Sequence, residues 1–131
     1  MSDIKDLQEK VAQFIAERDW NQFHSPKNIA MSIAIESAEL MEIFQWRTIE
    51  ESQKTELLEA KREDIEDEVA DIMIYLLSFV NVTKIDLYKA VVNKIDRNQS
   101  RFPIEKVLLE APITATPQGR NRESSISVLH L

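Results

Sequence analysis

Two pairs of acidic residues with the same three-residue spacing could bind a metal ion: Glu36 with Glu39, and Glu68 with Asp71. Successive residues of a helix are rotated by about 100°, so their directions can be compared from the sequence. Within about 60° of Glu36 lie four apolar residues, Ile29, Ile33, Leu40 and Ile43. Within about 60° of Glu68 lie Ile65, Ile72, Tyr75 and Phe79. Each helix therefore directs an acidic pair toward the face that should be buried.

A divalent cation would make the burial of these acids favourable. An unpaired carboxylate loses its hydration when it is buried, and converging carboxylates repel one another and tend to hold protons. Mg²⁺ prefers oxygen ligands and also accepts phosphate oxygens from a substrate. We therefore predict that Glu36, Glu39, Glu68 and Asp71 bind Mg²⁺, with Mn²⁺ as the alternative ion. A simpler interpretation, in which the four acids lie on solvated helix faces, remains open.

Other kinds of site are disfavoured by the composition. A di-iron carboxylate site normally uses a Glu-x-x-His motif on two helices, but neither His24 nor His130 follows an acid by three positions. The chain has no cysteine, which excludes thiol chemistry and cysteine-based zinc sites. Its single glycine, Gly119, excludes the glycine-rich loops that bring the backbone close to phosphate. Phosphate binding must therefore come from side chains or from a metal ion.

The charge balance bears on the partners. The chain has 23 acidic and 16 basic residues, a formal net charge of −7. Nucleic-acid binders usually carry the opposite balance, because they neutralise phosphates. We therefore expect no nucleic acid polymer as a partner. An acidic chain still binds a polyphosphate when a divalent cation screens the repulsion.

The pattern of apolar residues predicts an all-α fold with no strand. Helices are expected in four segments, with approximate bounds 4–20, 26–46, 55–82 and 87–101. Ser25 and Pro26 form a favourable helix start, and Asp86 is expected to cap the last helix. The polar residues 48–54 are expected to form a connection. We predict one helical domain over 1–110 and a polar, flexible tail over 111–131.

No segment resembles a membrane span or a targeting signal. No apolar run approaches the roughly 20 residues needed to cross a bilayer, and the N-terminus lacks the layout of a secretory signal. We expect a cytoplasmic protein with no membrane partner.

Four stretches, in order along the chain, resemble the MazG-like nucleotide pyrophosphohydrolases. They read ERDWNQFHSPKN, ESAELMEIFQW, EDEVADIMIYLL and KIDRNQSRFP, and the resemblance covers about residues 4–104. It is strongest to the short single-domain branch similar to dCTP pyrophosphatase. The resemblance implies a four-helix bundle protomer that forms a dimer or tetramer, with the site completed by packing between subunits. It implies Mg²⁺-dependent cleavage between the α- and β-phosphates of a nucleoside triphosphate, dCTP-like or modified, to a monophosphate and pyrophosphate.

The resemblance also assigns roles to individual residues. The two acidic pairs match the family's metal ligands, and Glu39 or a further acid, Glu42, would act on the attacking water. The residues expected to surround the nucleoside are Trp20, Phe23, His24 and Trp46. Those expected to contact the phosphates or the sugar are Tyr75, Lys94 and Asn98. Val11 departs from the pattern, because some dCTP-preferring members have a histidine there, so the preferred base stays open.

Two rival functions are compatible with the same residues. One is phosphoribosyl-ATP pyrophosphohydrolase, whose family also has acid-rich helices. The aromatic residues Trp20, Phe23 and Trp46 favour a nucleoside pocket of the dCTP type over it. The other is a non-catalytic helical interaction module, in which the acidic stripes would serve assembly.

Overall fold

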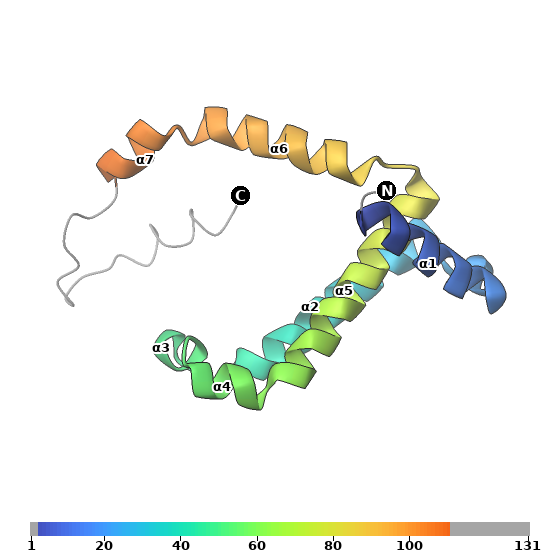
Figure 1. Cartoon of the computed structure of the whole chain (residues 1–131), viewed down its shortest axis with the longest axis horizontal. Coiled ribbons are helices and arrows are strands. Elements are labelled where there is room, and N and C mark those ends of the chain that lie inside the picture. Colours follow the sequence, from blue (N-terminus) through green and yellow to red (C-terminus); the bar gives the residue numbers. More distant parts are fainter. Residues whose placement is uncertain (1–2, 111–131) are drawn as a thin grey trace. The chain divides into compact units, whose positions relative to one another are not determined.

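The computed structural model describes residues 3–110, and every regular element in that range is helical (Figure 1). This confirms the predicted all-α class. Contacts between residues divide the chain into two units, 1–85 and 86–131, which are described separately below. The predicted tail, 111–131, lies outside the described residues.

The first unit is built on a pair of long helices, α2 (Pro26–Phe44) and α5 (Arg62–Thr83). They lie side by side and run in opposite directions (Figure 1). The chain turns through the links at the end of α2, and α5 then runs back along α2. Ser25 caps α2, as predicted, with its Oγ accepting a hydrogen bond from the Asn28 N–H at 3.2 Å. Ile29, near the start of α2, and Leu77, near the end of α5, are each only 1% exposed. Ile29 lies on the side of α2 that carries Glu36, whereas Leu77 lies on the opposite side of α5 from Glu68. The core of this unit is therefore not confined to the two stripes that carry the acids.

Helix α1 (Asp3–Glu17) packs on α5 through Val11 and Ile15, both of which are buried. A polar clamp fixes the contact: the Gln8 side-chain amide donates to Asn81 Oδ1 at 3.1 Å, and the Asn81 amide donates back to the Gln8 carbonyl at 3.1 Å. The helix ends at Glu17, three residues before its predicted end at Trp20. It cannot continue because Asp19 has a φ of 54°, in the left-handed region. The 3₁₀ helix η1 (Trp20–Phe23) follows.

The links between α2 and α5 differ from the prediction. The expected connection over 48–54 contains a short helix, α3 (Ile49–Ser52), which begins with a reciprocal pair of hydrogen bonds between Thr48 and Glu51. The expected single helix over 55–82 is divided at Lys61 into α4 (Thr55–Ala60) and α5. Helices in proteins are stabilised mainly by packing of an apolar face, and the charged first half of this segment has few apolar residues to pack. A break between α4 and α5 therefore costs little buried apolar contact.

The second unit contains α6 (Leu87–Arg101) and α7 (Ile104–Glu110). The bounds of α6 and its cap agree with the prediction: Asp86 Oδ1 accepts a hydrogen bond from the Lys89 N–H at 3.0 Å. Pro103 separates the two helices, and α7 was not predicted. Within residues 3–110, no helix is both long enough and apolar enough to cross a membrane.

Candidate metal centre

Three of the four predicted metal ligands lie together between α2 and α5. One carboxylate oxygen from each of Glu36, Glu39 and Glu68 lies within 4.8 Å of the other two. Oxygens that share a Mg²⁺ ion are each about 2.1 Å from it, and therefore about 3–4 Å from one another. The antiparallel pairing of α2 and α5 therefore builds a group able to hold a divalent cation.

Two of these oxygens are buried without a partner. Glu36 Oε2 and Glu68 Oε2 are inaccessible to solvent and form no hydrogen bond with any residue of the described chain. Leaving a buried acceptor unpaired is costly, and buried polar atoms in folded proteins almost always have a partner. This arrangement contradicts the simpler interpretation for these two acids, in which they lie on solvated faces. The missing partner fits a hard cation, because the donor set consists of carboxylate oxygens alone.

The same arrangement raises the pKa values of the two acids. Burial raises the pKa of Glu36 to about 7, with further increases from its contact with Glu39 and from the charges of Asp71 and Glu68. Burial also raises the pKa of Glu68, followed by the effect of Glu39 and then of Asp71. Without a cation, the cluster therefore holds protons, because removing them leaves several negative charges close together.

Asp71 and Glu42 lie outside the group of three converging carboxylates. Asp71 is half-buried on α5 and is close enough for its charge to raise the pKa of both Glu36 and Glu68. It does not belong to the group of three within 4.8 Å. Glu42 is exposed on α2, one turn beyond Glu39. The role predicted for Glu42 in acting on water stays a prediction.

The aromatic residues predicted to surround the nucleoside lie at opposite ends of α2. Trp20, Phe23 and His24 come just before the helix, and Trp46 follows its last residue by two positions. The helix has 19 residues and is therefore about 28 Å long. Trp46 is 88% exposed and Trp20 is 43% exposed. Within one copy of the chain, these two tryptophans are too far apart to contact the same base.

The remaining predicted residues lie on α5 and α6. Tyr75 is half-buried on α5, two helical turns beyond Glu68 and on the same side of the helix. Lys94 is exposed and Asn98 is half-buried, and both belong to α6 in the second unit. Their contacts with phosphates or sugar stay predictions, as does that of Tyr75.

The sequence of residues 31–110 matches the profile of the MazG-like family. The chain belongs to the MazG-like family. This confirms the resemblance found from the four sequence stretches. The matched residues include all four candidate metal ligands, which lie between Glu36 and Asp71, and also Trp46. Trp20, Phe23 and His24 precede the matched region.

Individual relatives support the same assignment. The chain is 38% identical over 101 residues to dCTP pyrophosphatase 1 of Bos taurus, a match that covers 77% of this chain and 60% of that protein. It is 37% identical over 100 residues to dCTP pyrophosphatase 1 of Homo sapiens, covering 76% and 59%. The chain thus spans about three-fifths of the length of these curated relatives.

A solved structure agrees in fold. The crystal structure of a pyrophosphatase from Archaeoglobus fulgidus superposes with a TM-score of 0.73 at 39% sequence identity. The match covers 79% of this chain and 94% of that one. The likeness therefore extends over nearly the whole of the archaeal chain.

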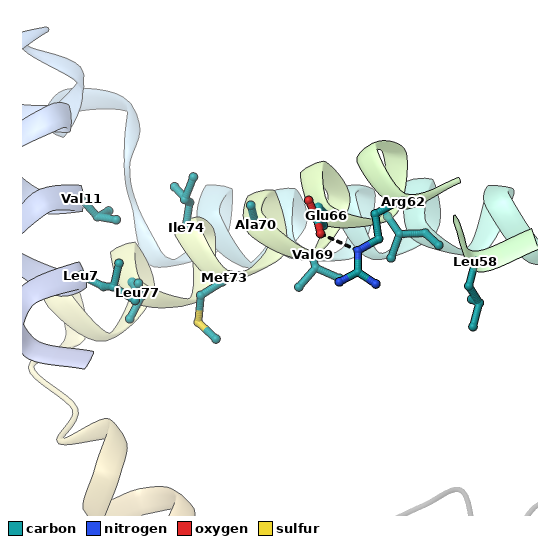
Figure 2. A pocket seen from close by; sticks show the side chains of 11 residues that line it. Leu7, Val11, Leu58, Arg62, Glu66, Val69, Ala70, Met73, Ile74 and Leu77 are labelled. Carbon is teal, nitrogen blue, oxygen red and sulfur yellow. Dashed lines mark hydrogen bonds and ion pairs between the residues drawn. The ribbon is translucent and has the colours of Figure 1, made fainter. Parts of the chain in front are cut away.

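Two features of this MazG-like chain were missed by the sequence analysis. The first is an apolar groove of about 690 Å³ between α1, α4 and α5, bordered by an ion pair in which Arg62 Nε lies 2.7 Å from Glu66 Oε1 (Figure 2). Most of its α5 residues, such as Met73 and Leu77, lie on the opposite side of the helix from Glu68. They form a second apolar face of α5, separate from the stripe that contains Glu68.

The second missed feature is a cluster of Phe14, Arg18 and Trp20 at the end of α1. The four-residue spacing of Phe14 and Arg18 places them on one side of a helix and could have indicated their contact. The position of Trp20 depends on the left-handed turn at Asp19, which no local pattern indicated.

Proposed function

We propose that this MazG-like protein is a Mg²⁺-dependent nucleoside triphosphate pyrophosphohydrolase. It would cleave between the α- and β-phosphates to give a nucleoside monophosphate and pyrophosphate. The observation that carries the proposal is the convergence, from two helices, of Glu36 Oε2 and Glu68 Oε2 as buried and unpartnered acceptors. The names of the relatives, dCTP pyrophosphatase 1 and pyrophosphatase, support the reaction class.

In this proposal Glu36, Glu39, Glu68 and Asp71 hold the ion. When bound, Mg²⁺ supplies positive charge that offsets both the carboxylates and the phosphate oxygens, and it acidifies coordinated water. Glu39 or Glu42 orients a water molecule and takes its proton as the water oxygen attacks the α-phosphorus. The bond from that phosphorus to the bridging oxygen breaks, and pyrophosphate leaves with the electron pair.

We also propose that the active form is a homo-oligomer, either a dimer or a tetramer. Among the described residues, the apolar side chains that are buried in one copy are Val11, Ile15, Ile29, Leu77 and Val80. Many other large apolar side chains stay exposed, including Met41 at 68% and Ile49 at 71%. Exposed apolar surface on this scale is typical of a protein–protein interface. The separation of Trp20 from Trp46 gives a second reason, since residues from two copies could enclose one base.

The proposed substrate is a nucleoside triphosphate, dCTP-like or carrying a modified base. Tryptophan offers a flat face on which a base stacks, and Trp20 and Trp46 are both accessible for this purpose. Lys94 and Asn98 on α6, with Tyr75 on α5, are the proposed contacts to phosphates and sugar. The proposed location is the cytoplasm, with no nucleic acid polymer or membrane as partner.

The experiment that tests this function is a substrate panel. The protein is incubated with Mg²⁺ and each common triphosphate, several base-modified triphosphates and phosphoribosyl-ATP, and the products are separated by chromatography. We expect equal amounts of monophosphate and pyrophosphate from at least one nucleoside triphosphate. Turnover of phosphoribosyl-ATP alone would identify the rival enzyme. No turnover of any compound, with no Mg²⁺-dependent rise in melting temperature, would favour the interaction module.

A further inference from the structure

A cation lies against two aromatic rings at the end of α1. The Arg18 guanidinium carbon is 3.8 Å from the centroid of the Phe14 ring and 6.0 Å from that of the Trp20 ring. The two rings meet edge to face, with centroids 5.7 Å apart and planes at 74°. Arg18 Nη1 also donates a hydrogen bond to the Phe14 carbonyl at 3.0 Å. The guanidinium is thus held on α1 and stands over the ring that Trp20 contacts.

The backbone around Trp20 is fixed independently of these rings. His24 Nδ1 lies 2.6 Å from the Trp20 carbonyl and must donate to it, because a carbonyl oxygen only accepts. The Gln22 side chain donates to the Asp19 carbonyl at 3.1 Å, and the Asn28 side chain donates to the Phe23 carbonyl at 3.1 Å. The backbone of η1 is therefore held by hydrogen bonds, whereas the orientation of the Trp20 indole depends on what packs against it.

We propose that Arg18 is a positioning residue that fixes the Trp20 indole for stacking on the nucleoside base. This inference rests on the proposed function. A flat guanidinium over an aromatic face is attracted by the ring's negative charge distribution, and it stacks in a way that a lysine ammonium does not reproduce. An indole that is already ordered loses less freedom when a base stacks on it. Arg18 therefore acts on substrate affinity rather than on the chemical step.

The first test follows the indole directly. The chain has two tryptophans, so Trp46→Phe leaves Trp20 as the single tryptophan fluorophore. In that background, Arg18→Met is expected to shift the Trp20 emission to longer wavelength and to lower its anisotropy, because the ring becomes more mobile and more hydrated. Arg62→Met is the matched control, since it removes an exposed guanidinium paired with Glu66 on α5, and it should change neither signal.

The second test separates binding from chemistry in the chain with both tryptophans. Arg18→Met is expected to raise KM about twofold to fivefold and to leave kcat unchanged. Arg18→Lys should recover part of both changes, because an ammonium group also binds over an aromatic face. Phe14→Leu removes both the ring beneath the guanidinium and the edge contact of that ring with Trp20, and should also raise KM. Arg18→Gln tests the guanidinium alone if Arg18→Met does not fold.

The proposal is overturned if Arg18→Met, or Arg18→Gln in its place, matches the Arg62→Met control in Trp20 emission and in KM. It is also overturned if the Arg18 variant lowers kcat at constant KM. A wild-type protein that hydrolyses no nucleotide would refute the proposed function instead. In that case the emission of Trp20 would still report whether Arg18 orders the indole.

Discussion

The carboxylate cluster and the aromatic residues differ in how much of each is assembled within one copy of the chain. Glu36, Glu39 and Glu68 converge because α2 and α5 pair along their length. Trp20 precedes α2 and Trp46 follows it, and the helix between them is about 28 Å long. If the proposed function holds, one chain would hold the ion by itself, whereas the nucleoside pocket would need residues from a second copy.

The largest effect is expected from removing a buried ligand. Glu36→Gln and Glu68→Gln should each lower kcat by about a hundredfold or more, because each removes a charge that the bound ion requires. Both variants should stay folded, since an amide is no more costly to bury there than an unpartnered carboxylate. The measurement is steady-state turnover with Mg²⁺, accompanied by circular dichroism. Glu63→Gln, an exposed acid in the first turn of α5, is the matched control, and near-normal activity in the Glu68 variant would exclude the metal assignment.

A smaller loss is expected at the margin of the cluster. Glu42→Gln should lower kcat about tenfold to a hundredfold if its carboxylate orients or deprotonates the attacking water. It should leave the affinity for Mg²⁺ unchanged, because Glu42 lies outside the three converging carboxylates. Turnover and calorimetric titration with Mg²⁺ measure the two quantities separately. An unchanged kcat would assign the proton transfer to Glu39.

Each tryptophan should contribute to substrate binding, and the two that enclose one base should come from two copies of the chain. Trp20→Ala and Trp46→Ala should each raise KM about tenfold, since losing a base–aromatic stack costs about 1–3 kcal/mol. Mixing the two variants, with subunit exchange, should restore part of the activity at low substrate concentration, because some sites then combine an intact Trp20 with an intact Trp46. Each variant measured alone is the control. No recovery after verified exchange would place the pocket within one copy.

The smallest effect concerns stability without metal. The pKa of Glu36 is raised from 4.5 to about 7 in the folded state, so the folded protein binds protons more tightly than the unfolded chain. The linkage relation then requires stability to fall as the pH rises from about 4.5 to about 7. We expect the melting temperature in EDTA to fall over this window. Glu36→Gln should flatten the dependence, and Mg²⁺ should restore the lost stability at pH 7 and above. An identical slope in the wild type and in Glu36→Gln would contradict the assigned pKa shift.

The sequence predicted those features that depend on the spacing of apolar residues along a helix. Periodicity placed Glu36 and Glu68 each inside an apolar stripe and so predicted that both acids face the interior. Their convergence also depends on the pairing of α2 with α5. The break at Lys61 was not predicted, because no proline or glycine marks it and it depends on where packing ends. The Phe14–Arg18–Trp20 cluster was missed for a similar reason, since it needs the left-handed turn at Asp19.

The central claim is that acids from α2 and α5 hold a divalent cation inside the helix pair, and anomalous diffraction tests it most directly. Crystals of the protein would be soaked in Mn²⁺ and measured near the manganese absorption edge. We predict an anomalous peak between α2 and α5, about 2.1–2.2 Å from Glu36 Oε2 and Glu68 Oε2. A map with no peak there, and with the two carboxylates turned apart into solvent, would contradict the account.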